Sequence, residues 1–329
     1  MALFTLGMRA TPTALLESLV EGSMIAAGGT PGRRRVRGGG MDDRVTAGER
    51  VEVAPGVRLH VERRPGAPAG SSFVLVHGLA SNLRLWDGVA EDLHARGHTV
   101  VALDQRGHGR SDAPEGGYDL DTAVADLAAL MGVLGVDRPI LVGQSWGGNV
   151  VLELAWRRPE TARGVACVDG GIIELAEWFP SWEACLAALT PPRLDGLGLR
   201  ELEARMRAAS PDLPDRAIAA GLANFRVRDD GRVEPRLARP RHLQILRSLW
   251  EHRPSTRFPT LTTPALLILA DSGDRARTAA KRRAEALARA AAPRLRSRWF
   301  APAHHDVHAQ FPGRVASLLD ETAREGFFA

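Results

Sequence analysis

The 329-residue sequence is poor in cysteine, lysine and aromatic side chains. Its two cysteines, Cys167 and Cys185, cannot form a disulfide framework, and a reducing cytoplasm suits such a chain. Lys281 is the only lysine among 43 basic residues, so arginine carries nearly all the positive charge. A net charge of +4 and the lack of a basic stripe with interleaved aromatics argue against nucleic-acid binding.

Long apolar runs are also missing, because no stretch approaches the ~20 apolar residues that a membrane-spanning helix needs. The N-terminal segment lacks the layout of a secretory signal, since Glu17 and Glu21 interrupt its apolar part and the arginines at 33–37 follow it. We therefore predict a disordered extension over residues 1–45, with Met41 as an alternative start. The protein is expected to be cytoplasmic, and the sequence does not indicate its oligomeric state.

Short apolar runs alternate with amphipathic helical stretches from residue 51 onwards, after a predicted hairpin over 51–62. Runs that are almost wholly apolar are typical of parallel strands buried on both faces, and the alternation predicts a doubly wound α/β sheet. The predicted strands are 73–77, 98–104, 139–143, 164–170, 265–270 and 295–300. The predicted helices between and after them are 84–96, 119–135, 146–158, 276–291 and 313–324.

One interval breaks this alternation. Residues 171–262 are mostly helical in pattern and too long for a simple crossover, so we predict an inserted helical cap that lies over the site as a lid. The core would then comprise residues 46–170 and 263–329. In open α/β sheets ligands bind at the carboxyl ends of the strands, so the residues that follow each strand are the candidates for function.

The sequence LVGQSWGGNV over 141–150 contains a G-x-S-x-G pattern between a predicted strand and a predicted helix. Such a pattern places Ser145 at the apex of a sharp, strained turn, where only glycine leaves room on either side. The start of the following helix points free N–H groups and the positive end of its dipole at the reacting oxygen. We therefore predict that Ser145 is a nucleophile; a tight turn with a solvated serine is the alternative.

Together with this turn, HGLASNLRLW (77–86) and DQRGHGRSD (104–112) resemble motifs of the α/β-hydrolase fold superfamily, especially its cap-bearing carboxylesterase and meta-cleavage-product hydrolase branch. The resemblance covers about residues 50–325. It implies a mostly parallel eight-stranded sheet, an oxyanion hole, a Ser–acid–His triad and no cofactor.

By this resemblance, Trp146 donates one backbone N–H to the oxyanion and Leu79 donates the second. His77 is expected to hold the Leu79 loop by hydrogen bonds and to take no part in the chemistry. The resemblance assigns structural and no catalytic roles to three residues of the second motif, Asp104, His108 and Asp112.

Three carboxylates are candidates for the triad acid. The family usually carries it after the strand that follows the cap, which favours Asp274, although the glycine of the usual pattern is displaced to Gly273. Asp169 is the rival, because some members of the superfamily take their acid after the preceding strand. Asp271 is the third candidate and lies closest to its strand.

The catalytic histidine is expected in APAHHDVHAQFP (301–312), after the last strand. His305 is predicted to be the base, with His304 and His308 as alternatives. A metal site built from these histidines is weighed against this, but no cysteine pair or H-E-x-x-H pattern supports it, and no metal is predicted. Asp306 is expected to cap the final helix.

Most of the few large aromatic residues gather in the inserted segment. Four of them are predicted to line a mainly apolar substrate pocket, although each could instead belong to the core of the cap: Trp178, Phe179, Trp182 and Trp250. His252 is expected at the surface, with the pocket as the alternative.

These residues predict a serine hydrolase that cleaves a carboxylic ester of a small substrate through an acyl-enzyme. The same triad would also serve hydrolysis of a lactone, an amide or a C–C bond, or a cofactor-free perhydrolase, because function depends on the pocket and not on the fold. Epoxide hydrolases and haloalkane dehalogenases of this fold use an aspartate nucleophile, which Ser145 argues against. A non-catalytic ligand receptor on the same scaffold is the alternative from another class.

Overall fold

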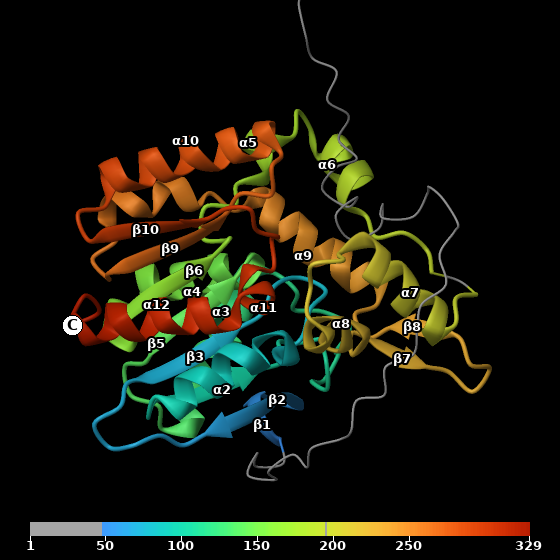
Figure 1. Cartoon of the computed structure of the whole chain (residues 1–329), viewed down its shortest axis with the longest axis horizontal. Helices are drawn as coiled ribbons and strands as arrows, with labels where there is room; N and C mark the ends of the chain where they lie inside the picture. The colour runs from blue at the N-terminus through green and yellow to red at the C-terminus, as the bar shows by residue number, and fades with distance from the viewer. Residues whose placement is uncertain (1–47, 195) are drawn as a thin grey trace, which may run out of the picture.

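The computed structural model describes residues 48–194 and 196–329. Its centre is one eight-stranded sheet in the order β1-β2-β4-β3-β5-β6-β9-β10 (Figure 1). β1 and β2 form the predicted hairpin and pair antiparallel, as do β2 and β4, whereas the remaining pairs are parallel. The strands are β1 (Glu49–Ala54), β2 (Val57–Arg64), β3 (Ser72–Val76), β4 (Thr99–Leu103), β5 (Ile140–Gln144), β6 (Gly164–Val168), β9 (Ala265–Ala270) and β10 (Leu295–Phe300). The predicted doubly wound, mostly parallel sheet is confirmed.

Helices cover both faces of the sheet. The core helices are η1 (Leu83–Trp86), α2 (Asp87–Ala95), α3 (Leu120–Leu134), α4 (Trp146–Arg157), η2 (Pro159–Thr161), α10 (Arg275–Ala291), α11 (Val307–Gln310) and α12 (Pro312–Arg324). Side chains of β3 alternate between two apolar clusters. Phe73 and Leu75 pack towards α2 and α12, whereas Val74 and Val76 pack towards α3 and α4. Since both of their faces are buried, the central strands β3, β4, β5, β6 and β9 are almost wholly apolar, as their sequence suggests.

The insertion between β6 and β9 differs in detail from its prediction. It contains α5 (Leu175–Trp178), α6 (Trp182–Leu189), α7 (Leu199–Ala209), α8 (Asp215–Leu222), β7 (Phe225–Val227), β8 (Val233–Pro235), α9 (Arg239–Glu251), η3 (Pro254–Thr256) and η4 (Phe258–Thr260). The first helical stretch of this insertion is divided into α5 and α6, because Pro180 lacks an N–H and Ser181 caps the second helix. The β7–β8 hairpin has no counterpart in the prediction.

Hydrogen bonds fix the insertion beside the carboxyl ends of the strands. The Asn82 side chain, in the segment after β3, donates to Ala220 O in α8 over 2.8 Å. Ser248 Oγ in α9 accepts from Leu120 N at the start of α3, also over 2.8 Å. The insertion therefore lies where the sequence places the candidate site, on the right of the sheet in Figure 1.

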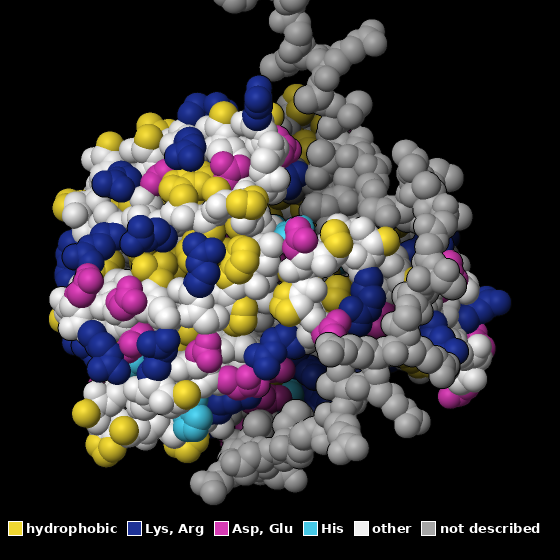
Figure 2. Space-filling model, viewed as in Figure 1, with side chains coloured by type: hydrophobic (Ala, Val, Ile, Leu, Met, Phe, Trp, Pro, Cys, Tyr) yellow, Lys and Arg dark blue, Asp and Glu magenta, His cyan; other side chains and the backbone are white. Residues whose placement is uncertain are grey.

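The predicted N-terminal extension, residues 1–45, lies outside the described residues, and β1 begins shortly after it at Glu49. Within residues 48–194 and 196–329, none of the helices combines the length and the apolar character that a membrane crossing requires. On the face seen in Figure 2, basic and acidic side chains are interspersed, with apolar patches between them.

Candidate active site

The turn that carries Ser145 has the strained geometry predicted from its glycines. Ser145 links β5 to α4 with φ 52° and ψ −121°, a positive φ that is costly for a residue with a Cβ. Its N–H donates to Val168 O over 2.9 Å, which holds the turn against the end of β6. A Cβ at Gly143 would lie 2.1 Å from Gly147 O, and one at Gly147 would lie 2.5 Å from His77 O. Neither position has room for a side chain, so both glycines are required.

The loop after β3 lies directly against this turn. A Cβ built on Gly78 would be 3.0 Å from the Cβ of Ser145. His77, which is fully buried, donates from Nδ1 to Gly78 O over 2.7 Å and accepts from Gln105 N at Nε2 over 3.0 Å. Burial lowers the pKa of His77, which favours the neutral ring that these two bonds require. His77 thus holds the loop, in agreement with its expected role.

A second histidine fixes the same loop from the other side. Nε2 of His108 accepts from Ala80 N over 3.2 Å, and its Nδ1 donates to Arg106 O over 2.9 Å. Burial lowers the pKa of His108 to about 3, so the ring is neutral and Nε2 is able to accept. Between the anchored Gly78 and Ala80 stands Leu79, the predicted oxyanion donor.

The base candidate and its carboxylate partner meet at the ends of β10 and β6. Nδ1 of His305 lies 2.6 Å from Oδ2 of Asp169, within the range of a strong charge-assisted hydrogen bond. Asp169 has no exposed side-chain surface, whereas the His305 side chain is 43% exposed. The Gln144 side chain donates to His305 O over 3.4 Å, which joins the histidine loop to the residue before Ser145. With Nδ1 directed at Asp169, Nε2 is the nitrogen left to act as a base.

Asp169 has an extensive set of partners. Its Oδ1 accepts from Ala270 N over 2.9 Å, and the Lys281 ammonium lies 2.8 Å from Oδ1 and 2.7 Å from Oδ2. Burial alone would raise the pKa of Asp169, but the hydrogen bond from His305 and the charge of Lys281 outweigh it and lower this pKa. The carboxylate is therefore ionised when His305 binds it. Lys281 was not among the predicted site residues.

The prediction that Asp274 partners His305 is wrong. Asp274 is the N-cap of α10, where its Oδ1 accepts from Arg277 N over 3.0 Å. Asp271 is also used locally, because its Oδ1 accepts from Gly273 N and from the Thr278 hydroxyl. Asp274 thus caps α10 and Asp271 bonds to residues near the start of that helix, while the rival candidate Asp169 occupies the position beside the imidazole.

The other members of the histidine-rich segment take no part in this contact. His308 lies in α11, almost fully buried, with its ring 4.2 Å from that of Trp86. The backbone N–H of His304 donates to the Gln310 side chain. Asp306 stands at the N-cap position of α11, but its side chain makes no capping hydrogen bond there, unlike its expected role. In the described part of the chain, no group of three or more His, Cys, Asp or Glu side chains is arranged to hold a metal ion.

The four aromatic residues predicted for the pocket pack with the apolar cluster that includes Trp146. Phe179 is buried, and the rings of Trp182 and Trp250 lie 6.1 Å apart with the Arg247 guanidinium 5.0 Å from the first. These contacts fit a cap core. A role for Trp178, Phe179, Trp182 and Trp250 in substrate binding stays a prediction.

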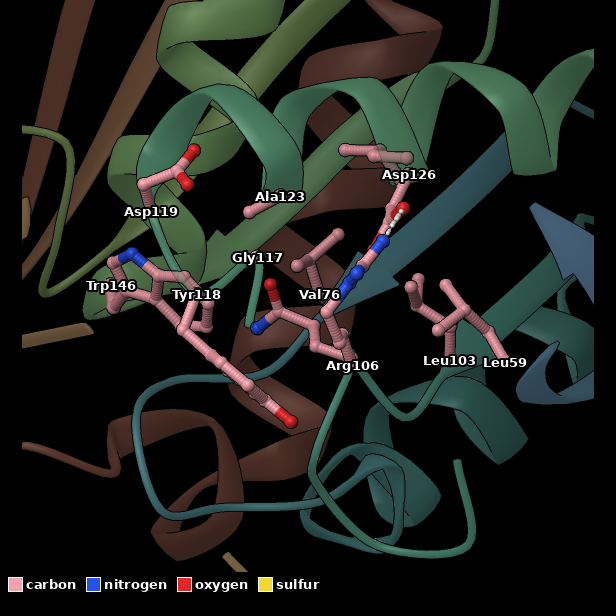
Figure 3. Close-up of a pocket in the computed structure, with 12 residues that line it drawn as sticks. Leu59, Val76, Leu103, Arg106, Gly117, Tyr118, Asp119, Ala123, Asp126 and Trp146 are labelled. Atoms are coloured by element: carbon pink, nitrogen blue, oxygen red, sulfur yellow. Dashed lines mark hydrogen bonds and ion pairs between the residues drawn. The ribbon is translucent and has the colours of Figure 1, made fainter. Parts of the chain in front are cut away.

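Beside Trp146 there is a narrow cavity, lined in part by Tyr118 and by the Arg106–Asp126 ion pair (Figure 3). Its size is that of a water molecule, so it cannot hold a substrate.

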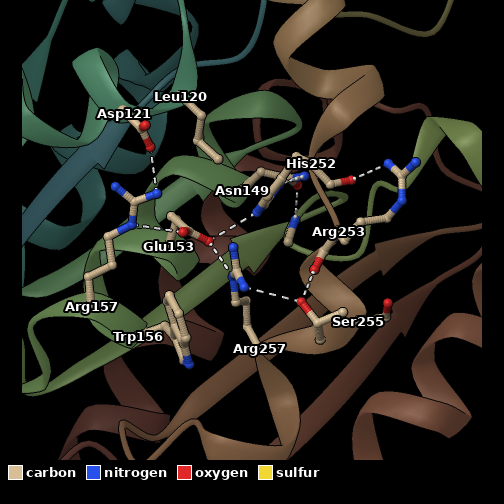
Figure 4. A network of polar contacts seen from close by, with 12 residues as sticks. Leu120, Asp121, Asn149, Glu153, Trp156, Arg157, His252, Arg253, Ser255 and Arg257 are labelled. Carbon is tan, nitrogen blue, oxygen red and sulfur yellow. Dashed lines mark hydrogen bonds and ion pairs between the residues drawn. The ribbon is translucent and has the colours of Figure 1, made fainter. Parts of the chain in front are cut away.

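A buried polar network connects α4 to the insertion (Figure 4). Glu153 of α4, which is fully buried, accepts from His252 Nε2 over 3.1 Å, from Arg257 over 2.9 Å and from Arg157 over 2.8 Å. Nδ1 of His252 accepts from the Asn149 amide over 3.0 Å. The expectation that His252 lies at the surface is therefore wrong. Its neighbours in sequence gave no sign of the carboxylate on α4 that pairs with it.

The comparisons with known proteins agree with this architecture. A family model described as alpha/beta hydrolase fold matches residues 72–191. An uncharacterized protein of Mycobacterium tuberculosis (strain H37Rv) is 35% identical over 115 residues, which are 34% of this chain and 33% of that protein. The chain thus spans about a third of the length of that relative.

A longer match is to 2-(acetamidomethylene)succinate hydrolase of Mesorhizobium japonicum, 28% identical over 68% of this chain and 77% of that enzyme. Among solved structures, E-2-(acetamidomethylene)succinate hydrolase superposes with a TM-score of 0.71 and 24% identity, over 84% of this chain and 99% of that chain. At this identity the structural likeness supports the fold alone.

Proposed function

We propose that this chain, which has the α/β-hydrolase fold, is a serine hydrolase that cleaves a carboxylic ester of a small, mainly apolar substrate. The observation that carries the proposal is the contact of His305 Nδ1 with Asp169, at the sheet edge where the strained turn presents Ser145.

In this proposal Ser145 Oγ attacks the ester carbonyl while Nε2 of His305 takes its proton. The backbone N–H groups of Leu79 and Trp146 stabilise the oxyanion, each contributing about 3–4 kcal/mol to transition-state stabilisation. His305 then gives the proton to the leaving alcohol, which leaves an acyl-enzyme on Ser145. Water activated by His305 hydrolyses the acyl-enzyme and restores the free serine. Asp169 fixes the imidazole tautomer and stabilises the imidazolium formed in both acylation and deacylation.

The acyl or alcohol group of the substrate would lie against the insertion, which acts as a lid in this proposal. The aromatic residues that pack with the Trp146 cluster support an apolar pocket: Trp178, Phe179, Trp182 and Trp250. No step requires a cofactor, because all the groups used are side chains or backbone amides.

A second candidate is hydrolysis of a non-ester bond by the same residues. The match to an enzyme named 2-(acetamidomethylene)succinate hydrolase favours it, since the match extends over 77% of that enzyme. Lactones, amides and C–C bonds are further candidate substrates, because the pocket and not the triad determines which bond is cleaved.

The experiment is labelling with a fluorophosphonate probe, followed by a panel of p-nitrophenyl esters of graded acyl length, a lactone, an amide and 2-(acetamidomethylene)succinate. We expect covalent labelling and ester turnover in the wild type, with neither in Ser145→Ala, whose rate should fall by several orders of magnitude. A folded wild-type protein that is neither labelled nor active on any member of the panel would instead support a non-catalytic ligand receptor.

A further inference from the structure

Lys281 is placed against the acid of the proposed triad with all of its donors used. It extends from α10, its side chain is 8% exposed, and its ammonium lies within 2.8 Å of both oxygens of Asp169 and of Ala270 O. An ammonium has three N–H donors and no acceptor, so three oxygen partners satisfy it fully. A buried, fully satisfied ion pair of this kind has a defined geometry and a defined charge.

Position 281 carries a lysine in a chain whose basic residues are otherwise all arginine. Arginine supplies the other 42 of the 43 basic residues, and the one lysine stands beside the triad acid. A guanidinium is a planar fork with five donors, which suits two parallel bonds to a carboxylate. The point charge of an ammonium can instead bond both oxygens of Asp169 and one backbone carbonyl from one compact position.

Oδ2 of Asp169 is shared between two cationic partners. It accepts from Lys281 over 2.7 Å and from His305 Nδ1 over 2.6 Å. Without the ammonium, the Asp169–His305 pair would carry a net negative charge when the imidazole is neutral. Such a pair binds a proton tightly, whichever of the two residues holds it. With the ammonium present, that state is neutral overall and its affinity for a proton is lower.

From this geometry, and resting on the proposed function, we propose that Lys281 is a positioning residue that sets the pH range of the enzyme. It anchors the Asp169 carboxylate and lowers the proton affinity of the Asp169–His305 pair, so that the imidazole is available as a base at lower pH. The residue acts through Asp169 and does not touch the substrate.

Other titratable groups surround this pair, and the variants leave them in place. Asp306 and His304 flank His305 in sequence, and Asp306 interacts electrostatically with His305 and Asp169. His308 of α11 interacts electrostatically with His305, and Asp271, which follows β9, does so with Lys281. Burial is the main cause that raises the pKa of Asp306 and lowers that of His308 to about 3, which leaves His308 neutral over the working range.

The test compares the pH dependence of kcat/KM in Lys281→Met, Lys281→Arg and the wild type, with the best ester of the panel as substrate. Methionine keeps the unbranched side chain up to Cε and removes the charged group, so the acid limb of the profile should move up by about 1–2 pH units. Arginine keeps the charge, and its acid limb should stay within about half a unit of the wild type. Arg283→Met removes a charge from an exposed position of the same helix and should leave the profile unchanged.

A purely structural role for Lys281 would lower the stability of both variants and leave the acid limb in place. A folded Lys281→Met protein with the wild-type acid limb would therefore overturn the proposal. Absence of probe labelling and turnover in the wild type would count against the proposed function instead, so the two failures are distinguishable.

A second measurement needs neither turnover nor a Lys281 variant. Protein labelled with ¹⁵N-lysine carries a single side-chain ammonium, so its NMR signal reports on this contact alone. The signal should shift as the Asp169–His305 pair binds a proton, and His305→Ala should abolish that shift. A lysine signal that does not respond to pH between about 4 and 8, where histidine ordinarily titrates, would overturn the proposal.

Discussion

Nδ1 of His305 lies 2.6 Å from Oδ2 of Asp169, although 136 positions separate the two residues in the chain. Asp169 follows β6 directly and His305 stands in the loop after β10, with β9 between these strands in the sheet. The carboxylate therefore reaches the imidazole across the end of β9, where Ala270 N donates to it.

The first prediction concerns the identity of the acid. Asp169→Asn should lower kcat by about 10⁴-fold, because the imidazole loses the carboxylate that fixes its tautomer. Asp274→Asn should keep kcat near the wild-type value, since Asn caps a helix about as well as Asp does. Steady-state kinetics of both variants decide the matter, and an equal loss in Asp274→Asn would contradict the assignment.

The second prediction concerns the turn glycines. In Gly147→Ala the new Cβ would lie 2.5 Å from Val76 O and His77 O, both in backbone that cannot move aside. We expect a loss of about 2–4 kcal/mol in the free energy of unfolding, measured with urea. Gly132 is the matched control, because it lies in α3 with nothing within 4 Å of an added Cβ. Gly132→Ala should stabilise the protein by about 0.5–1 kcal/mol.

The third prediction concerns the loop that carries Leu79. His108→Ala leaves Ala80 N–H without its acceptor, so the neighbouring Leu79, the proposed oxyanion donor, loses its fixed position. We expect kcat to fall by about 10²-fold, within the effect of removing one oxyanion donor, and KM to change little. His94→Ala, at an exposed position on α2, provides the control and should have wild-type kinetics. A larger change in KM than in kcat would place His108 in substrate binding.

The fourth prediction concerns Glu153 and acid. Burial alone would raise the pKa of Glu153, but hydrogen bonds from His252, Arg257 and Arg157 outweigh it and lower this pKa to about 2. Because the folded-state pKa is depressed below the unfolded value of about 4.3, the carboxylate contributes its full stability above that pH. The contribution is lost as the pH falls from about 4.3 towards 2.

Urea unfolding of Glu153→Gln should therefore show a deficit of about 3–5 kcal/mol at pH 7, which becomes smaller near pH 3. Glu325→Gln breaks an exposed ion pair with Arg296 and should cost less than about 1 kcal/mol at either pH. A deficit in Glu153→Gln that does not depend on pH would show that the side chain stabilises the fold by packing and not by charge.

Sequence patterns over a few neighbouring residues correctly predicted strand bounds and the strained turn. β9 and β10 begin and end at the predicted residues, and the strained turn at Ser145 follows from the room that its glycines leave. The prediction that Asp274 partners His305 failed because Asp274 also satisfies the pattern of a helix N-cap, and the chain uses it as one. Only the order of β6, β9 and β10 in the sheet decides which carboxylate meets His305.

The sequence likewise could not predict the contacts that single polar residues make with partners far away in the chain. In the sequence Lys281 looks like a further basic residue of the amphipathic helix α10. Only its being a lysine among arginines could have marked it as a candidate site residue. His252 reads as an exposed helix end, because nothing near it in sequence reveals Glu153. Both pairings arise from the packing of elements that are far apart along the chain.

The burial of the only lysine also affects how an esterase assay can be interpreted. Activated esters such as p-nitrophenyl acetate acylate free surface amines, and this slow side reaction releases the same yellow product as enzymatic turnover. Here the single side-chain amine is 8% exposed and bonded to Asp169, while the surface cations are guanidinium groups that stay protonated. An initial burst of p-nitrophenol should accordingly carry little background from acylated lysine.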